Sequence, residues 1–225
     1  MPGRAVIGVR DPDPRTAGEG FARLRAAAVD VVMADRPLCR DSLAGYLTRK
    51  HQGRPFVTLK LAMTADGFIA RPDGSSQWIT GEAARAHAHR ERARSDAILV
   101  GVGTLRADAP RLDVRLPGLE NRSPRRFVLT SGAAPEGWTA LANPSEIAGI
   151  DAQYLMVEGG AQVAEAFLAA ALVDRLLLYR APVEFGEGIA AFRNPGGAGV
   201  PAGWHLADRR QLGSDTLEVY TRAEP

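Results

Sequence analysis

The chain has 225 residues, 45% of them hydrophobic and 24% charged, a composition that is typical of a globular protein and excludes an extensively disordered one. Its 28 basic and 26 acidic residues give a formal net charge of +2 without any long basic run, so we expect no nucleic-acid partner. The single cysteine excludes an internal disulfide, and the lack of a signal-peptide core or of an apolar run near the ~18 residues of a membrane helix predicts a cytoplasmic protein with no membrane partner.

The first 50 residues carry a short alternating pattern of strands and helices. A strand, a helix, a strand and a helix are predicted in turn over residues 5–9, 20–28, 29–33 and 38–49. The stretch 48–55 is polar and contains Gly and Pro, which favours a linker. We therefore expect residues 1–50 and residues 54–225 to form separate units.

The remainder of the chain has the pattern of an α/β domain. Thr80 is expected to cap its first helix, which runs to about Arg94, and a second helix follows Gly160. The predicted strands are 57–63, 96–101, 126–130, 154–158 and 175–183, followed by an antiparallel pair over 204–206 and 216–221 with a charged turn between them. Helices between strands imply a mostly parallel sheet, which the terminal hairpin makes mixed.

Lys60 is unusual, because lysine occurs only at positions 50 and 60 and Lys60 lies inside an apolar strand. Val57, Leu59, Leu61 and Met63 alternate on one face of that strand, which places Lys60 on the other. A buried ammonium is costly without a partner, so Lys60 belongs either to a solvated strand face or to a paired functional site. The strand by itself leaves both interpretations open.

Two glycine junctions follow predicted strands, at Gly101-Val102-Gly103 and at Gly159-Gly160. Glycines let the backbone approach a ligand closely, and a helix that begins after them presents free N–H groups to a phosphate. Tight turns without a ligand explain each junction equally well, and neither matches the G-x-G-x-x-G fingerprint. His87 and His89 are two residues apart on a predicted helix, so we expect solvated side chains and no metal.

Several motifs taken together resemble one family. The segments VTLKLAMTADG, SSQWIT, ILVGVGTLRADAPRLDVR and MVEGG occur in the order found in the reductase domain of the bifunctional riboflavin-biosynthesis deaminase/reductase. The resemblance extends from about Arg54 to the C-terminus. It implies a dihydrofolate-reductase-like, three-layer αβα fold of the α/β class, with a mixed, mostly parallel central sheet.

The first 50 residues resemble the last βαβ portion of the family's deaminase domain, through the pattern V-x-x-x-DPDP-x-x-x-G-x-G-x-x-x-LRAA. The zinc signature H-x-E with P-C-x-x-C does not occur in this sequence, so we expect a small non-catalytic remnant and no deaminase activity. A native start upstream of Met1 is the alternative.

The resemblance also implies an activity and a set of site residues. The family uses NADPH to reduce the ribosyl group of 5-amino-6-(5-phosphoribosylamino)uracil to a ribityl group, and its members commonly form homodimers. Residues 131–153 form a shorter segment than the family usually has, which leaves the choice between NADPH and NADH open. The implied cofactor contacts are Ala62, Trp78, Thr104, Asp108, Ser131, Gly160, Ala161, Gln162, Val163, Ala164, Glu165 and Ala166, and the implied contacts to the phosphorylated substrate are Ser76, Arg92, Leu112, Arg115 and Glu158.

Lys60 and Glu158 are the candidate catalytic residues, because both extend from strands expected to be central and each would offset the cost of burying the other. Lys60 is expected to orient or protonate the opened ribose, and Glu158 to hold the uracil or the sugar hydroxyls. Two alternatives remain open. One is another reductase of the same fold that acts on a pterin or folate, and the other is a non-catalytic remnant that binds NADPH.

Overall fold

The computed structural model describes residues 3–76, 78–192 and 199–222, so Gln77 of the SSQWIT motif lies outside the described residues. Its N-terminal elements are β1 (Arg4–Ile7), α1 (Glu19–Ala26), β2 (Asp30–Met33), α2 (Pro37–Ser42) and α3 (Ala44–Gln52). The elements that follow are β3 (Phe56–Met63), β4 (Phe68–Ala70), α4 (Glu82–Ala93), β5 (Ala97–Gly101), α5 (Val102–Asp108), η1 (Glu120–Arg122), β6 (Arg125–Leu129), β7 (Thr139–Leu141), η2 (Pro144–Gly149), β8 (Tyr154–Glu158), α6 (Ala161–Ala169), β9 (Arg175–Arg180), β10 (Ile189–Ala190), β11 (Trp204–Leu212) and β12 (Asp215–Arg222).

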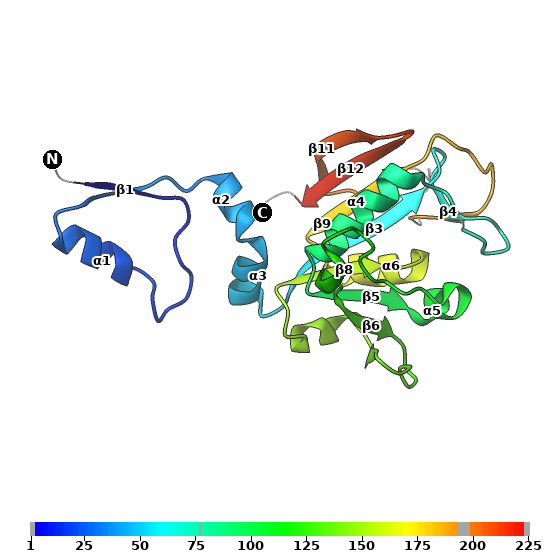
Figure 1. Cartoon of the computed structure of the whole chain (residues 1–225), viewed down its shortest axis with the longest axis horizontal. Helices are drawn as coiled ribbons and strands as arrows, with labels where there is room; N and C mark the ends of the chain where they lie inside the picture. Colours follow the sequence, from blue (N-terminus) through cyan, green and yellow to red (C-terminus); the bar gives the residue numbers. More distant parts are fainter. Residues whose placement is uncertain (1–2, 77, 193–198, 223–225) are drawn as a thin grey trace.

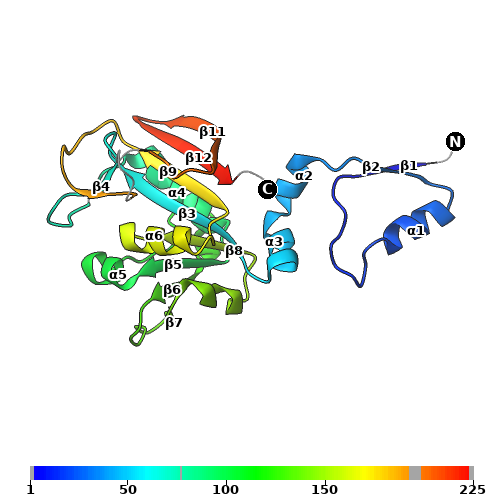
Figure 2. The same ribbon diagram turned by 180° about the vertical axis from the view of Figure 1, so that it is seen from behind.

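The main body is built on an eight-stranded sheet in the order β11-β12-β9-β3-β8-β5-β6-β7. The pairings from β9 through β3, β8, β5 and β6 to β7 are parallel, whereas β12 pairs antiparallel with β9 and with β11. Helices α4 and α6 pack on opposite faces of this sheet (Figures 1 and 2). The predicted α/β fold with a mixed, mostly parallel sheet is confirmed.

The larger core lies on the face that α6 covers. Val57, Leu59, Leu61 and Met63 of β3 all point to this face and are at most 2% exposed, which confirms the alternation predicted for this strand. Phe167 of α6 is fully buried against them. Thr58, Lys60 and Ala62 of β3 point to the opposite face, which α4 covers.

The α4 face is packed with smaller side chains and carries the polar groups of the sheet. Ala84 and Ala88 of α4 contact Leu177 and Tyr179 of β9 and Leu217 of β12. Small alanine side chains allow α4 to lie close to the strands, so polar side chains near its C-terminal end contact side chains of the sheet.

The N-terminal segment folds as an arm beside this body, with β1 and β2 as a separate two-stranded parallel sheet. Figure 1 shows β1 and α1 (dark blue) away from the central sheet, with α2 and α3 between. α3 makes the contact with the body: a Cβ at Gly45 would lie 2.6 Å from the ring of Tyr154, and Arg49 Nη1 donates a 3.0 Å hydrogen bond to the Ala148 carbonyl.

Four local predictions were wrong. The stretch 48–55 is helical as far as Gln52, because α3 continues through it, and the single helix expected over 38–49 is divided into α2 and α3 near Leu43. Thr80 does not cap α4, whose N-cap is Gly81, with its N–H donated to Asp215 Oδ2 at 2.7 Å. The charged segment between the last two strands is itself part of β11, which pairs with β12 as far as Leu212 and Asp215.

The expectation that His87 is solvated was also wrong. His87 is only 7% exposed, because it lies on the same stripe of α4 as Ala84, Ala88 and Glu91, at the helical spacing that faces the sheet. His89, on a different face, is partly exposed. Within the described ranges, no helix is long and apolar enough to cross a membrane.

Candidate active site at the carboxyl ends of the parallel strands

Three charged side chains from three elements meet on the α4 face of the sheet. Lys60 of β3 and Glu158 of β8 are paired positions in neighbouring parallel strands, so their side chains point to the same face. Arg92, in the last turn of α4, donates from Nε and Nη2 to the two carboxylate oxygens of Glu158 at 2.6 and 2.8 Å. Lys60 Nζ lies 3.8 Å from Glu158 Oε2. The result is a buried cluster of two cations around one carboxylate.

The charges of this cluster are set by burial and by one another. Burial by itself would raise the pKa of Glu158, but the Arg92 guanidinium and the Lys60 ammonium outweigh that effect and lower the pKa to about 2. Burial lowers the pKa of Lys60, and Arg92 adds to this effect while Glu158 opposes it. Glu158 is therefore an anion at neutral pH, whereas Lys60 loses its proton more readily than a solvated lysine.

Lys60 is a paired, mostly buried residue. Its side chain is 20% exposed and that of Glu158 is 10% exposed, so the solvated strand face is excluded. The separation from Glu158 is longer than a normal hydrogen bond, since Arg92 already holds both carboxylate oxygens. The ammonium therefore retains N–H groups that can donate to a ligand.

A cavity of about 500 Å³ lies next to Arg92 and is lined by Arg111, Asp113 and Arg115. Arg92 Nη1 donates to the Asp113 carbonyl at 3.3 Å, which joins the cavity wall to the cluster. Asp113 Oδ1 is buried without a hydrogen-bond partner among the described residues, and the same carboxylate pairs with Arg111 through Oδ2 at 2.7 Å and with Arg115 through Oδ1 at 3.4 Å. The cavity thus offers guanidinium groups that can bind an anionic group and a carboxylate oxygen that can accept a hydrogen bond from a ligand.

The two glycine junctions lie side by side, and one residue of α6 packs against both. A Cβ at Gly101 would lie 2.5 Å from Val163 Cγ2, and one at Gly159 would lie 2.6 Å from Val163 Cβ. A Cβ at Gly160 would have only Thr104 Oγ1 near it, at 3.9 Å, and one at Gly103 would meet nothing within 4 Å. The junctions therefore form an open cradle beside the start of α6, where no described side chain caps the free N–H groups.

The structure places the other implied residues in two groups. Leu112, Val163 and Ala164 are 4%, 7% and 0% exposed, so they pack beneath the surface, and a ligand would reach them only through a change in structure. Trp78 is 72% exposed, with the Arg85 guanidinium 5.0 Å from its ring centroid. The positions that are partly or fully exposed are Ala62, Ser76, Thr104, Asp108, Arg115, Ser131, Gly160, Ala161, Gln162, Glu165 and Ala166.

Sequence reasoning missed two groups that lie against the cluster. Tyr179 of β9 and His87 of α4 are buried and share a 2.8 Å contact between the hydroxyl and Nδ1. The spacing of Ala84, His87, Ala88 and Glu91 was the available signal, because these positions form one face of a helix. Among the described residues, no group of three or more His, Cys, Asp or Glu side chains is arranged to hold a metal ion.

Comparisons with known proteins identify the family and the fold. The RibD C-terminal domain family matches residues 55–150 and 145–217. The RibD proteins of Corynebacterium ammoniagenes and Mycobacterium tuberculosis are 39% and 37% identical over 203 and 235 residues, which cover 82% and 96% of this chain. The chain spans 60% and 69% of the lengths of these two relatives.

A crystal structure from Thermotoga maritima, of a diaminohydroxyphosphoribosylaminopyrimidine deaminase/5-amino-6-(5-phosphoribosylamino)uracil reductase, has a TM-score of 0.84 and 25% identity. The likeness covers 98% of this chain and 72% of that one, so it includes the N-terminal arm. The α/β architecture of the body is that of the dihydrofolate-reductase-like RibD structures. This chain belongs to the RibD C-terminal domain family of riboflavin biosynthesis.

Proposed function

We propose that this chain catalyses the NADPH-dependent reduction of the ribosyl group of 5-amino-6-(5-phosphoribosylamino)uracil to a ribityl group. The observation that carries the proposal is the buried cluster of Lys60, Arg92 and Glu158, with an open glycine cradle at the carboxyl ends of the same sheet. Ligands of open α/β sheets bind at these ends. Family membership supports the same reaction class.

The cradle fits a dinucleotide cofactor. Gly160, Ala161 and Gln162 present backbone N–H groups at the start of α6, and the Thr104 hydroxyl lies next to Gly160, so a pyrophosphate could be bound there without a clash with any Cβ. NADPH, when bound, supplies the hydride. Ala62, Trp78, Asp108, Ser131, Glu165 and Ala166 are proposed as further contacts along the same edge.

The substrate is proposed to lie between Arg92 and the neighbouring cavity. Arg115 and Arg111 line that cavity, and a planar guanidinium can donate two parallel hydrogen bonds to a phosphate. Ser76 is partly exposed in the loop before α4 and is proposed to contact the sugar. Asp113 and Glu120 also line this cavity, so the two guanidinium groups, and not a net positive charge of the cavity, are proposed to bind the phosphate.

The proton chemistry is assigned to Lys60. When C1′ of the opened ribosyl group gains a hydride, an adjacent heteroatom must gain a proton, and Lys60 Nζ is a buried donor with N–H groups not taken up by Glu158. Glu158 favours the charged form of this amine, and Arg92 holds the carboxylate in place. The lone pairs of Glu158 that Arg92 leaves open can accept hydrogen bonds from the sugar hydroxyls or the uracil.

The test is NADPH oxidation by the purified chain with three compounds: the deaminated pyrimidine phosphoribosylamine, its undeaminated precursor, and dihydrofolate. Oxidation with the deaminated compound alone supports the proposal. Oxidation with dihydrofolate alone would assign the chain to a folate reductase. NADPH binding by folded protein without oxidation of any compound would assign it a non-catalytic role.

Two further proposals concern organisation. Residues 1–50 and 54–225 are proposed to be separate units that meet through α3, and the chain is proposed to form a homodimer. β9 lies inside the sheet between β12 and β3, so its apolar faces are covered within the chain and do not by themselves require a second copy. Light scattering of the purified chain measures the oligomeric state directly.

A further inference from the structure

Tyr179 and His87, to which the proposed reaction gives no role, lie directly beside Lys60. β9 pairs with β3 so that Tyr179 is opposite Ala62, which puts its ring on the face of Lys60. Lys60 Nζ is 5.8 Å from the centroid of that ring. The Tyr179 hydroxyl is 2.8 Å from His87 Nδ1, and the two residues are 1% and 7% exposed. A continuous line of contacts therefore runs from α4 through β9 to the functional amine.

Lys60 has few other contacts that would hold its ammonium. Its nearest carboxylate oxygen is 3.8 Å away, and that carboxylate is occupied by the two N–H groups of Arg92. The Arg92 guanidinium repels a second cation, while the face of an aromatic ring attracts one. Among the described residues, the ring of Tyr179 is the one further attractive neighbour found for the Lys60 ammonium.

The pair that carries this ring is uncharged near neutral pH. Burial lowers the pKa of His87, and burial raises the pKa of Tyr179. Neither group therefore gains or loses a charge in the neutral range, and their hydrogen bond keeps the ring orientation fixed. The charged groups that act on the pair are Glu91, Arg90 and Arg94 of α4, Arg175 of β9, Arg210 of β11 and Glu158 of β8.

We propose that Tyr179, oriented by its hydrogen bond with His87, is a positioning residue for Lys60: its ring face holds the Lys60 ammonium beside Glu158 and favours the charged form of the amine. The inference rests on the proposed function in one respect, since a proton donor must be protonated when the substrate binds. Burial and the Arg92 charge both disfavour the Lys60 ammonium. Without the ring these two effects meet less opposition, so the amine loses its proton at lower pH.

The sequence offers a direct measurement, because Lys50 and Lys60 are its only lysines. Lysine labelled with ¹³C at Cε gives two NMR signals, which the variant Lys50→Arg assigns. A pH titration of the full chain then reports the pKa of Lys60 without any assay of activity. Tyr179→Leu removes the ring, and Tyr179→Phe removes only the hydroxyl. Leu178→Ala is the matched control, since Leu178 is fully buried on the opposite face of the same strand.

We expect the Lys60 pKa to fall in Tyr179→Leu, to fall less in Tyr179→Phe, which keeps the ring and loses the hydrogen bond that orients it, and to stay near that of the parent in Leu178→Ala. The kcat for NADPH oxidation is expected to fall roughly two- to fivefold in Tyr179→Leu, the size of one cation–π contact, with KM unchanged. An unchanged Lys60 pKa in Tyr179→Leu, or an equal change in Leu178→Ala, would overturn the proposal.

Loss of Tyr179 leaves His87 buried without its partner, so Tyr179→Leu can fail to fold. The double variant Tyr179→Leu/His87→Leu replaces both polar groups by apolar ones and is then titrated in the same way. A lower Lys60 pKa than that of the parent supports the proposal, and an unchanged one overturns it. Failure of the proposed function is separable: a Lys60 pKa that depends on the ring, in a chain that oxidises no NADPH, would retain the positioning role and refute the reductase.

Discussion

The N-terminal arm and the body are both built from parallel strands and helices, but only the body has a hydrophobic core behind its strands. Every buried hydrophobic side chain of the described residues lies at or beyond Val57, and in the arm, defined as residues 3–36, the one buried residue is Asp13. Val6, Val32 and Met33 of its two strands are 64%, 39% and 43% exposed. Parallel strands are normally covered on both faces, so strands without a core behind them contribute little to stability.

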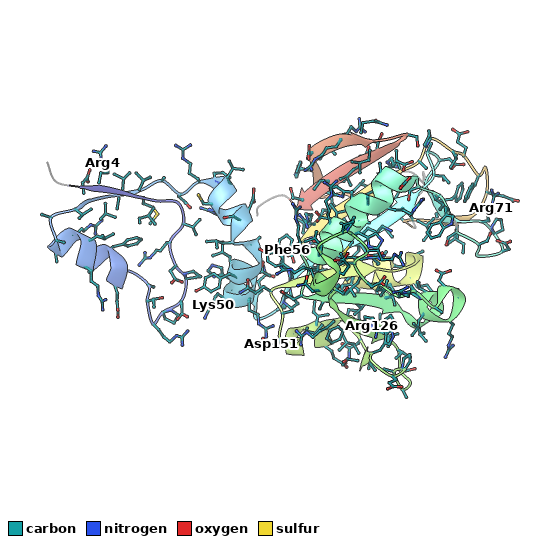
Figure 3. The ribbon with its side chains drawn as sticks, in the orientation of Figure 1. Arg4, Lys50, Phe56, Arg71, Arg126 and Asp151 are labelled. Atoms are coloured by element: carbon teal, nitrogen blue, oxygen red, sulfur yellow. The ribbon has the colours of Figure 1, made fainter. Side chains whose placement is uncertain are left out.

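The two regions also differ in how charge is used. In the body, Glu158 is held by Arg92 inside the fold, next to the cradle proposed to bind a cofactor. In the arm, Asp13 accepts a 2.7 Å hydrogen bond from Lys50 of α3. Figure 3 shows Lys50 between the arm and the body. The charge of Glu158 thus belongs to the proposed site, whereas Asp13, the one buried residue of the arm, ties the arm to α3, and the predictions below test these two regions.

The largest expected effect is the loss of a core aromatic side chain. Phe167→Ala removes a fully buried ring from α6 and should lower the free energy of unfolding by about 3–5 kcal/mol. Phe21→Ala, the same change at a half-buried position of α1 in the arm, should lower the free energy of unfolding by less than about 1 kcal/mol. Urea-induced unfolding measures both. Equal losses would show that the arm shares the core of the body.

The two lysines provide the second comparison, now in activity. Lys60→Met should lower kcat/KM for NADPH oxidation at least about a hundredfold, the scale of a lost proton donor. Lys50→Met, in α3, should leave kcat/KM near the parent value, because its contacts are with Asp13 and the Tyr46 ring. Steady-state kinetics on both variants, with circular dichroism to verify folding, separates them. A fully active Lys60→Met would remove the amine from the mechanism.

An effect of intermediate size on the free energy of unfolding is expected when the pH is lowered. The pKa of Glu158 is lowered from its usual 4.5 to about 2, so its ionised form is stabilised by the fold. That contribution is fully present above about pH 4.5 and is lost as the pH falls toward 2. The difference in unfolding free energy between the parent and Glu158→Gln should therefore shrink across this window. A difference that is constant from pH 6 to pH 3 would contradict the depressed pKa.

The smallest effect concerns the attachment of the arm. The Arg15 and Lys50 hydrogen bonds lower the pKa of Asp13, so their contribution to stability is fully present above its usual value of 3.8 and is lost only as the pH falls well below that value. Asp13→Asn should expose residues 3–36 to faster cleavage by trypsin and leave thermal unfolding of the body unchanged. Asp30→Asn, which affects only the surface pair with Arg4, serves as the control. Equal cleavage rates for the two variants would refute this attachment.

Much of the fold could be predicted from the sequence because it depends on local periodicity. The alternation in β3 identified which side chains enter the core and put Lys60 on the other face, and both results are confirmed. The end of α3 and the cap of α4 could not be predicted in this way. The cap of α4 depends on a distant segment, through the hydrogen bond from the Gly81 N–H to Asp215, whereas α3 ends at Gly53, a left-handed glycine cap that apolar periodicity does not report.

The sequence by itself determined the longer strands and the two main helices of the body, the resemblance to the reductase domain and the residue types available to the site, whereas α5, β4, β7 and β10 were not predicted. The tertiary structure decided which of these residues meet. Arg92 binds Glu158 across 66 positions, and His87 reaches Tyr179 across 92. Periodicity assigns a side chain to a face of its own element, but a partner on another element is chosen by how the helices pack on the sheet. That is the physical reason why the Lys60–Glu158 pair could be proposed from the sequence, whereas the ion pair of Arg92 with Glu158 and the Tyr179–His87 contact could not.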